Sequence, residues 1–595
     1  MPDSSPTPWI GRVLSTSPTV AVVDPFSENR TLEVRSRPPV SAGCYVSVAQ
    51  GADVSEVVEV LATAGSARAA IYDLIVEREL NPSFPRRVEA EVAMLLDDPG
   101  IDDPDLVDLT GRPFVTVDGA CTRDLDQALW LERAGDGYRV WYALADASFY
   151  VRPGMAVFEE ALRRGASFYL PGLVVPMLPR ALSENLISLN AGEPRRATVF
   201  RMDLDAKGCC RGTRLLRARI RSFAKLTFDD VQSMYDGPDA SGLRGEPYAE
   251  SLSLLREVGN LRIADAEQRD VVRYRRSEVD VGLEGEDGLR FVVLDDFRRE
   301  VERYNEQLSL LCNMEGARFL FLGDRPDDNV QPIYRVHPRP RPERIAEFEG
   351  VLEALARGHD LEVSFWTWKR GRGTSLAAFL AALPSEGEHA AVARAIHRQA
   401  VLLNLRSSFS EEAGEHYGVG AELYARFSSP MREIVGVFVH KEAWEKEMGG
   451  PLAPRWTAPA SDPEGDDALR TTVVRRANLA KEVQNELDKV CNGLVIDRML
   501  SRDLAMVPQE RPLRPGTVMG LTRSKVHVLL DTPSLDVKLY VNHVAAQQAA
   551  DVQLDAEGAS WRDADGHPIV RLGDRVIVRL VGREERGNRW ILEMV

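Results

Sequence analysis

The stretch FVTVDGACTRDLDQALWLE, residues 114–132, decides the fold at the centre of the chain. A first apolar run ends on Asp118, and the polar loop that follows carries Asp124 and Asp126. Two further apolar runs flank the turn sequence AGDG at 134–137, a pattern that predicts a β-hairpin. The sequence therefore places three carboxylates on a short loop at one end of a sheet.

Three carboxylates on so short a loop predict a bound cation. They repel one another unless a positive charge lies among them. Hard oxygen ligands at this density suit Mg²⁺ or Mn²⁺, which keep coordination positions open for water and phosphate. The loop therefore predicts a site for metal-assisted phosphodiester cleavage. The alternative is an acidic surface turn, because short acidic motifs often occur without a metal.

The composition is typical of a soluble, multidomain globular protein. The chain has 595 residues, of which 44% are hydrophobic and 28% are charged, enough for several domains. No run of about 18 apolar residues predicts a membrane span, and the N-terminal stretch lacks the basic start and apolar core of a signal peptide. The six scattered cysteines have no zinc spacing, which favours a reducing cytoplasm.

The formal net charge of −17 argues against a nucleic-acid partner when it is taken alone. However, net charge is a sum over the whole molecule, whereas binding is local. A channel lined by arginine with a metal at its end is compatible with an acidic protein. The negative net charge therefore counts against a nucleic-acid partner but does not exclude one.

The pattern of elements predicts a multidomain α/β and β protein. Residues 1–65 read as a small β-barrel of the OB or cold-shock type, with a winged helix as the alternative because 55–62 is also compatible with a helix. Residues 66–110 form a helical connector, 111–505 a central mixed α/β domain, and 512–595 a C-terminal OB-like barrel.

Periodicity within the central region predicts its main elements. Helices are expected at 66–97 (two), 157–164, 250–276, 298–322, 341–358, 389–406 and 470–502. Strands are expected at 195–224 and 278–296, and a long Pro/Gly-rich loop at 447–466. Arg217, Arg219 and Arg221 alternate along one strand and share a face. We favour a solvated sheet face here over a phosphate-tracking one.

Several motifs in order resemble the ribonuclease II / ribonuclease R family of 3′→5′ exoribonucleases. They are FVTVDGACTRDLDQAL, YALADASFYVRPG, FYLPG with VPMLPRALSENLISL, YRVHPRPRPERI, and HYGVGAELYARFSSPMRE followed by His440. The match covers most of residues 60–505, the catalytic domain of that family, and extends into a C-terminal S1-like OB domain. The resemblance implies an RNB-type catalytic domain between two small barrels.

The resemblance implies a role for the acidic loop. Asp118, Asp124 and Asp126 match three of the four active-site aspartates of the family, which hold magnesium. The fourth position is Gln127, whose amide offers one neutral carbonyl ligand and would hold a metal less tightly. This departure makes binding of a second metal an open question.

The resemblance also implies RNA contacts. Tyr169 matches a tyrosine near the 3′-terminal nucleotide, and Tyr274 is similar in position to an aromatic residue that stacks on the last bases. Arg432 matches an arginine at the scissile phosphate. Glu306 matches a family residue on the helix expected at 298–322, as does Asn313.

Two further positions depart from the family. Glu433 replaces a second basic residue, and Gln307 replaces a glutamate. His416 and His440 could be read as catalytic bases, but we expect them to be structural because a metal-activated water needs no imidazole.

The sequence therefore predicts a Mg²⁺-dependent exoribonuclease that digests single-stranded RNA processively from the 3′ end and releases nucleoside 5′-monophosphates. We expect a cytoplasmic monomer with no membrane association and no obligatory protein partner. One alternative is an RNA-binding relative whose site has decayed, because of Gln127, Glu433 and Gln307. A second alternative is a phosphodiesterase acting on small nucleotides.

Overall fold

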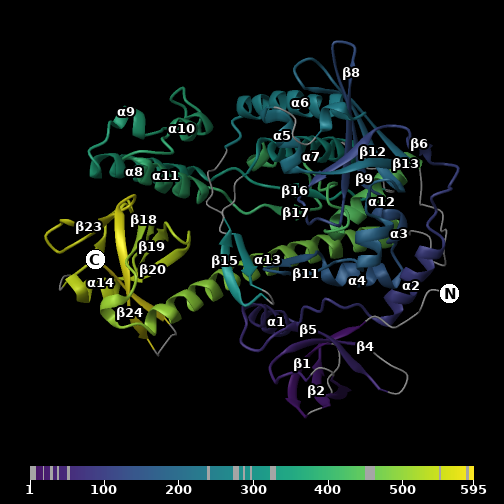
Figure 1. Cartoon of the computed structure of the whole chain (residues 1–595). Coiled ribbons are helices and arrows are strands. Elements are labelled where there is room, and N and C mark those ends of the chain that lie inside the picture. The colour runs from purple at the N-terminus through teal and green to yellow at the C-terminus, as the bar shows by residue number, and fades with distance from the viewer. Residues whose placement is uncertain are drawn as a thin grey trace.

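The computed structural model describes residues 8–595 except 18, 27–30, 37–38, 50–53, 238–241, 273–279, 286–287, 295–297, 322–329, 449–462, 549–550 and 585–588. The chain forms an N-terminal barrel, a central sheet with its helices, and a lobe that contains the C-terminal strands (Figure 1). The long helix α13 (Pro463–Leu504) runs from the central part to the C-terminal strands.

The N-terminal domain is a closed five-stranded barrel with the order β1-β2-β3-β5-β4. Its strands are β1 (Trp9–Thr16), β2 (Val20–Pro25), β3 (Leu32–Arg35), β4 (Tyr45–Ala49) and β5 (Glu56–Ala62). The barrel encloses a core of alternating valines, as expected for strands with one buried face. The predicted OB-like barrel is confirmed. The winged-helix alternative is wrong, because 56–62 pairs as a strand with β4.

The helical connector is confirmed as two helices. They are α1 (Ala67–Glu77) and α2 (Arg86–Asp97). The side chain of Ser66 caps α1 by accepting a hydrogen bond from the Ala69 amide at 3.0 Å. Leu74 and Ile75 face the barrel as part of a shared core.

The central sheet has six strands in the order β12-β9-β8-β7-β13-β6, and an additional β12–β13 pairing closes it on itself. They are β6 (Val107–Asp108), β7 (Phe114–Asp118), β8 (Gln127–Ala134), β9 (Gly137–Ala145), β12 (Pro194–Leu204) and β13 (Cys210–Thr227). The predicted hairpin is β8–β9, in which Ala134 pairs with Gly137 at the turn.

The solvated sheet face favoured for Arg217, Arg219 and Arg221 is wrong at Arg217, whereas Arg221 is exposed as predicted. Arg217 does not lie on a solvated face, because its guanidinium donates at 2.8 Å to the buried carboxylate of Asp146. Arg219 pairs with the exposed Asp108 at 3.1 Å. Two arginines on one face of β13 therefore differ, since only one of them reaches the interior.

The central part of the chain also contains helices and short strands outside the sheet, of which β14 and β15 lie beside α13 and α1 (Figure 1). They are α3 (Ala147–Tyr150), α4 (Ala156–Arg164), β10 (Phe168–Leu170), β11 (Leu173–Val175), the helical turn η1 (Ala181–Leu186), α5 (Phe228–Asp236), η2 (Leu243–Gly245), α6 (Ala249–Gln268), β14 (Asp280–Glu284), β15 (Arg290–Leu294), α7 (Glu300–Leu320), β16 (Tyr334–Val336), β17 (Ser408–Ser410), η3 (Tyr417–Val419) and α12 (Ile434–Met448). The helices expected at 157–164, 250–276 and 298–322 correspond to α4, α6 and α7. The loop expected at 447–466 falls largely outside the described residues, and α13 begins at Pro463.

Four helices between β16 and β17 form a separate core. They are α8 (Pro342–Gly358), α9 (Val363–Trp366), α10 (Leu376–Ala382) and α11 (Ala390–Val401). Their core includes Leu572 from the C-terminal domain. The Arg394 guanidinium donates to the Thr517 hydroxyl at 3.0 Å, and the Gln399 amide donates to the Met519 carbonyl at 2.9 Å. This lobe therefore packs on the C-terminal strands (Figure 1).

The C-terminal domain is rich in strands, as predicted for an OB-like fold. Five strands pair in the order β20-β19-β18-β24-β25, and three short ones in the order β21-β22-β23. The elements are η4 (Pro508–Glu510), β18 (Arg514–Leu521), β19 (Lys525–Leu530), β20 (Asp536–Tyr540), α14 (Val541–Gln548), β21 (Gln553–Leu554), β22 (Ser560–Arg562), β23 (Pro568–Arg571), β24 (Arg575–Glu584) and β25 (Arg589–Met594). Among the helices of the described chain, none has the length and apolar character needed to cross a bilayer.

Candidate nuclease site

The acidic loop lies at one end of the central sheet, between β7 and β8. Asp118 is the last residue of β7, and its carboxylate accepts hydrogen bonds from the Gly119 amide at 2.8 Å and the Thr122 hydroxyl at 3.0 Å. These contacts fold the loop back on the strand end. The carboxylate is thereby held at the tip of the sheet.

Asp126 is the buried member of the trio, with 1% of its surface exposed. One carboxylate oxygen accepts the Met431 amide at 3.0 Å, and the other accepts Nε of Arg432 at 2.6 Å. Burial raises the pKa of Asp126, whereas the Arg432 guanidinium and the Met431 amide act to lower it. A segment some 300 residues downstream therefore supplies the cation that faces this carboxylate.

Asp124 adds a second acidic group with an altered pKa. Burial raises the pKa of its carboxyl, Arg432 acts to lower it, and the nearby Asp126 and Asp118 act to raise it further. The three aspartates are thus close enough to influence one another. Such a group favours the binding of a divalent cation, since the added positive charge relieves both the burial and the repulsion.

The structure also shows what limits the trio. Within the described residues, the carboxylate oxygens of Asp118, Asp124 and Asp126 do not all approach within 4.8 Å of one another. Arg432 lies beside Asp126 instead, and burial acts to lower its pKa while Asp126, Tyr169 and the other two aspartates raise it. The donor set fits Mg²⁺, but the carboxylates would have to draw together around it.

Gln127, predicted as a fourth ligand, begins β8 beside the trio. Its side-chain carbonyl oxygen accepts a hydrogen bond from the hydroxyl of Tyr142 on β9. Burial raises the pKa of Tyr142, so the hydroxyl stays a donor. A ligand role for Gln127 stays a prediction, and it would compete with this hydrogen bond.

Tyr169 lies on the β10–β11 hairpin and faces Arg432. Its side chain is 44% exposed, and burial of the hydroxyl raises its pKa to about 12, although Arg432 acts to lower it. Gln484 of α13 clamps the hairpin, because its side-chain amide accepts from the Tyr169 amide and donates to the Tyr169 carbonyl, both at 2.9 Å. The structure therefore brings the predicted Tyr169 to the predicted Arg432.

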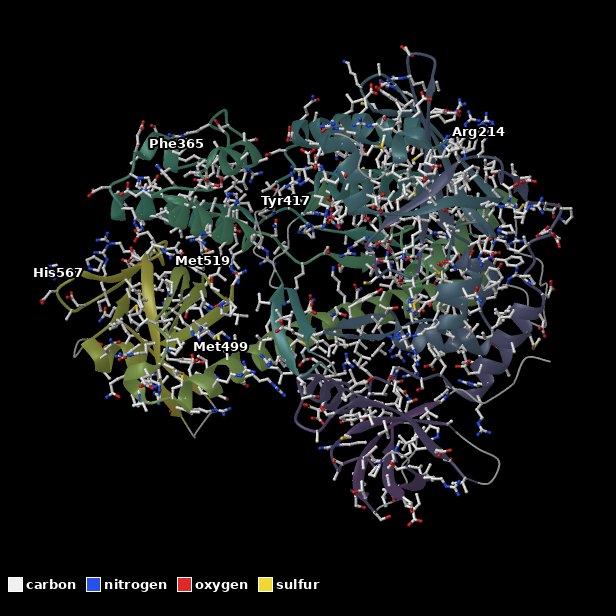
Figure 2. All side chains as sticks on the ribbon, in the orientation of Figure 1. Arg214, Phe365, Tyr417, Met499, Met519 and His567 are labelled. Atoms are coloured by element: carbon white, nitrogen blue, oxygen red, sulfur yellow. The ribbon has the colours of Figure 1, made fainter. Side chains whose placement is uncertain are left out.

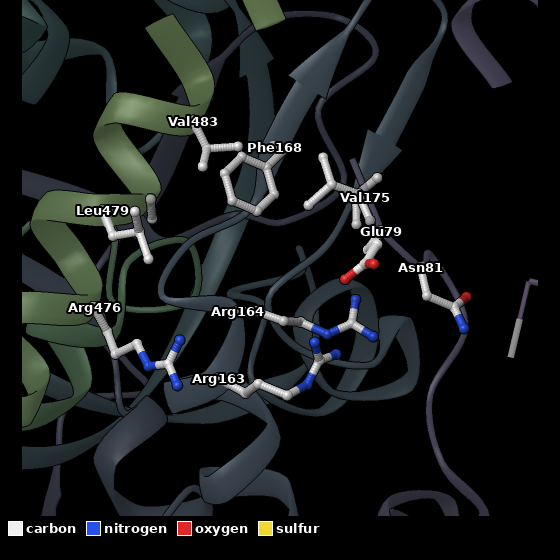
Figure 3. A pocket seen from close by; sticks show the side chains of 11 residues that line it. Glu79, Asn81, Arg163, Arg164, Phe168, Val175, Arg476, Leu479 and Val483 are labelled. Carbon is white, nitrogen blue, oxygen red and sulfur yellow. The ribbon is translucent and has the colours of Figure 1, made fainter. Parts of the chain in front are cut away.

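The other side of the same hairpin lines a pocket (Figure 3). Phe168 and Val175 form part of its wall, together with apolar residues of α13. Successive residues of a strand point to opposite faces, so Phe168 packs behind Tyr169. Arg163 and Arg164 also line it and donate to Glu160 at 2.6 and 2.8 Å. We infer that the apolar contacts between the hairpin and α13 in this wall hold the hairpin in place.

The segment before α12 is shaped by Asn313 of α7, which is fully buried. Its amide oxygen accepts the backbone amides of Phe427 and Ser428 at 2.8 and 2.9 Å, and its amide nitrogen donates to the Ser428 and Tyr424 hydroxyls at 2.8 and 2.9 Å. One side chain thus fixes the entry to the turn that carries Arg432.

The turn itself contains an unusual backbone conformation. Ser429 has a φ of 66°, in the left-handed region that side chains rarely adopt. Gly436 is needed behind it, because a Cβ there would approach the Pro430 backbone to 2.7 Å. Strain of this kind persists where the surroundings fix the geometry. The contacts to Asn313 supply that restraint.

Helix α7, which carries Asn313, also contacts the end of β7 beside the aspartates. Asn305 of α7 donates to the Val117 carbonyl at 3.2 Å, one residue before Asp118. Helix α7 therefore reaches both the strand end with the aspartates and the turn with Arg432. Asn305 and Gln484 could not be picked out from the sequence, because each acts by bonding to the backbone of a distant segment, which leaves no motif.

Glu306 and Tyr274 are not brought to the site by the described contacts. Glu306 on α7 is 42% exposed in its side chain and pairs with Arg298 at 3.1 Å. Tyr274 lies outside the described residues. Their roles in RNA binding stay predictions.

The two histidines behave as structural residues. Nε2 of His440 lies 2.9 Å from the Phe427 carbonyl, and burial lowers its pKa to about 4. Burial also lowers the pKa of His416 to about 3, as do Arg335 and His337. Both rings are therefore neutral near pH 7 and packed against the turn and its neighbours.

Two other acidic groups lie elsewhere. Asp563, Asp565 and His567 gather on a loop at the outer edge of the C-terminal domain (Figure 2). Glu442, Glu445 and Asp466 are buried together, but the ammonium of Lys441 donates to all three at 2.7–2.8 Å. Lysine therefore already occupies the centre of the second group.

The site thus combines a closed sheet, a carboxylate loop and a downstream arginine turn, between an N-terminal barrel and a C-terminal β domain. The RNB domain model matches residues 106–444, more than half of the chain, and the chain belongs to the RNB family. Ribonuclease R of Escherichia coli is 28% identical over 553 residues, covering 90% of this chain and 63% of that protein. Exoribonuclease 2 of Serratia proteamaculans is 30% identical over 336 residues, covering 56% and 50%. The chain thus spans less than two thirds of these relatives.

Solved structures share the fold. Mycoplasma genitalium RNase R in complex with ribose-methylated single-stranded RNA superposes with a TM-score of 0.77 at 18% identity, covering 99% of this chain and 90% of that one. Yeast Ssd1, described as a pseudonuclease, superposes with a TM-score of 0.59 at 13% identity, covering 97% and 68%. At these identities the likeness shows the fold alone.

Proposed function

We propose that the protein is a hydrolytic exoribonuclease that degrades single-stranded RNA processively from the 3′ end and releases nucleoside 5′-monophosphates. The observation that carries the proposal is the convergence of Asp118, Asp124 and Asp126 with Arg432 and Tyr169, which come from three distant segments. Relatives named Ribonuclease R and Exoribonuclease 2 support it.

The aspartates would hold Mg²⁺, with Mn²⁺ as a substitute and Gln127 as a fourth ligand. Bound there, the cation would polarise the phosphate and lower the pKa of a water nucleophile. Asp126 and Arg432 share one ion pair, so a phosphate that enters competes with Asp126 for the guanidinium. The planar fork of Arg432 can then donate two hydrogen bonds to the non-bridging oxygens.

Tyr169 would position the terminal nucleotide. Its ring is half exposed beside Arg432 and its backbone is clamped, so the exposed face can stack on any base without reading it. Tyr274 and Glu306 are further proposed RNA contacts. Stacking and phosphate contacts are indifferent to sequence, which suits an enzyme that degrades RNA generally.

We also propose that the protein acts in the cytoplasm as a monomer without an obligatory partner. All six cysteines are free thiols in the structure, as expected for a reducing compartment. The proposed domain boundaries are 1–65, 66–110, 111–505 and 512–595. The four-helix core of α8–α11 packs on the C-terminal strands. Limited proteolysis would test whether these helices separate with the 111–505 domain or with the 512–595 domain.

The first prediction concerns Asp126. Replacing it by asparagine (Asp126→Asn) removes the charge at the buried centre of the site, and we expect cleavage of 5′-labelled poly(A) to fall by about three orders of magnitude, roughly 4 kcal/mol in barrier height. Denaturing gels and chromatography of the mononucleotides give the measurement. RNA binding should be retained.

The matched control is Asp136→Asn, at the exposed turn of the β8–β9 hairpin that follows Asp126 in the chain. It should cleave like the parent protein. Full activity in Asp126→Asn would remove the catalytic role of the aspartates, and absence of any product from the parent protein with Mg²⁺ or Mn²⁺ would refute the proposed function.

Two observations favour a second candidate, an inactive RNA-binding protein. Gln127 is neutral and engaged by Tyr142, and the fold is shared with a pseudonuclease. A third candidate, a phosphodiesterase for small nucleotides, is separated by substrate length. An enzyme that holds a strand prefers oligomers, whereas a small-nucleotide enzyme would cleave dinucleotides at least as fast.

A further inference from the structure

A second group of cations lies beside Arg432, around Glu433. Arg426 pairs with the Glu433 carboxylate at 3.1 Å. Arg335 of β16 also acts on Glu433 and lowers its pKa, after Arg426. Lys481 of α13 lies within the field of the same carboxylate. Three elements that are distant in sequence thus bring cations to one acidic side chain.

Two of these cations share a hydroxyl oxygen. The ammonium of Lys481 donates to Oγ of Ser407 at 2.8 Å and to its carbonyl at 3.0 Å. The guanidinium of Arg335 donates to the same Oγ at 3.3 and 3.4 Å. The positive charges of Lys481 and Arg335 repel each other, and the uncharged Ser407 accepts hydrogen bonds from both without neutralising either charge.

The positive charge is in excess. Arg335, Arg426 and the exposed Arg406 all act on Lys481, and Glu433 is the carboxylate that acts on Arg335, Arg426 and Lys481 alike. Burial lowers the pKa of Lys481 to about 8, and Arg335, Arg426 and Arg406 act in the same direction against Glu433. Partly buried cations in excess favour an anion from solution.

The cluster adjoins the proposed active site. Glu433 follows Arg432 directly and forms a bridge with Ala166, and the Arg432 carbonyl accepts the Ser167 amide at 2.9 Å. The same short segment leads into β10 and Tyr169. Arg432 also acts on the pKa of Arg426 and of Glu433, so the cluster lies within the electrostatic field of the arginine proposed to bind the scissile phosphate.

We propose that Arg335, Arg426 and Lys481 form a phosphate-binding subsite for the RNA backbone, next to the phosphate held by Arg432. The inference rests on the proposed function for its ligand, a single RNA strand. Guanidinium forks and a flexible ammonium match successive phosphates. Together these side chains grip the backbone of the strand upstream of the nucleotide that is removed.

The test is the salt dependence of RNA binding. We expect Lys481→Met to weaken binding of a fluorescein-labelled oligo(A) in EDTA, where hydrolysis is blocked. The slope of log affinity against log salt should fall by about 0.7, the value for one lost phosphate contact with a single strand. Fluorescence anisotropy across a potassium chloride series gives the slope.

A matched control lies on the same helix. Lys489→Met removes an exposed lysine of α13, outside the cluster, and its slope should equal that of the parent protein. Equal slopes for both variants and the parent would overturn the proposal. So would binding of inorganic phosphate at the cluster without a change of RNA slope.

The pH dependence adds an independent measurement. With a pKa of about 8, Lys481 loses its charge between pH 7 and pH 9, so parent affinity for RNA should fall across that interval. The charged and titratable groups that act on it or that it acts on are Arg335, Arg406, Arg426, Glu433, His337 and His416. Lys481→Arg stays charged and should abolish the fall. A fall of equal size in Lys481→Arg would contradict the subsite.

These experiments separate the subsite from the enzymatic activity. A protein that does not cleave RNA, but whose binding slope changes as stated, keeps the subsite and loses the proposed hydrolysis. A protein that cleaves RNA with unchanged slopes keeps the hydrolysis and loses the subsite.

Discussion

The surroundings of Gln127 and of Glu433 differ in how each departure from the family is balanced. At position 433 an acid replaces a base, and Arg426 pairs with it at 3.1 Å. At position 127 an amide replaces an acid, and a neutral hydroxyl, that of Tyr142, is its partner. Position 433 keeps a charge pair, whereas position 127 lacks a charge in the group that we propose to hold a cation.

The comparison shows that a change of charge is not in itself a sign of decay. Glu433 keeps its pKa low because Arg426, Arg335 and Arg432 outweigh its burial. Three arginines thus stabilise the negative charge of Glu433. Gln127 satisfies its hydrogen bond but offers a metal weaker attraction than a carboxylate. Of the two departures, we therefore expect the one at 127 to have the larger effect on the proposed activity.

The largest effect is expected from breaking the compensated pair. Glu433→Met leaves Arg426 partly buried beside other cations, and we expect the free energy of unfolding to fall by about 3 kcal/mol. Urea denaturation followed by circular dichroism gives the value. The double variant Arg426→Met/Glu433→Met should recover most of the loss. Additive losses would show that the two side chains do not act as a pair.

A smaller effect is expected from restoring the missing charge. Gln127→Asp adds a carboxylate to the trio, and the Mg²⁺ concentration for half-maximal cleavage should fall about tenfold, or about 1.4 kcal/mol. Magnesium titrations of poly(A) cleavage measure it. The control Gln127→Asn keeps the charge neutral and should give no gain. No cleavage in either the parent or Gln127→Asp would favour the RNA-binding candidate.

The smallest effect concerns the neutral partner. Tyr142→Phe removes the hydroxyl that binds Gln127 and leaves a partly buried carbonyl oxygen without this donor, which should cost about 1 kcal/mol of stability. Thermal or urea unfolding measures it. Unchanged stability would show that the hydrogen bond contributes little. A loss far above this value would point to a wider role for Tyr142 in the sheet.

Much of the fold could be predicted from local pattern. The hairpin β8–β9, the barrel strands and most helices follow from alternation, turn residues and helical periodicity. Residues 55–62 were ambiguous because a short apolar run fits either a helix or a strand, and pairing with β4 decides between them. Tertiary contact settled what local propensity left open.

The candidate site was predictable in its members and not in its contacts. The resemblance supplied the aspartates, Tyr169 and Arg432. It did not predict that Arg432 lies on Asp126, because the two are separated by 306 residues. It read Glu433 as a lost base, because a pair with Arg426 is visible only in three dimensions.

Helix α13 joins parts of the molecule that are otherwise separate. Gln484 holds the Tyr169 hairpin, Arg498 donates to the Gly65 and Ser66 carbonyls before α1, and Asp497 accepts from the Trp590 indole of β25. A helix turns by about 100° per residue. An insertion or deletion between 484 and 497 would therefore rotate the N-terminal barrel and the C-terminal strands relative to the Tyr169 hairpin. The number of residues between these contacts of α13 therefore fixes how the parts of the molecule that it joins are oriented.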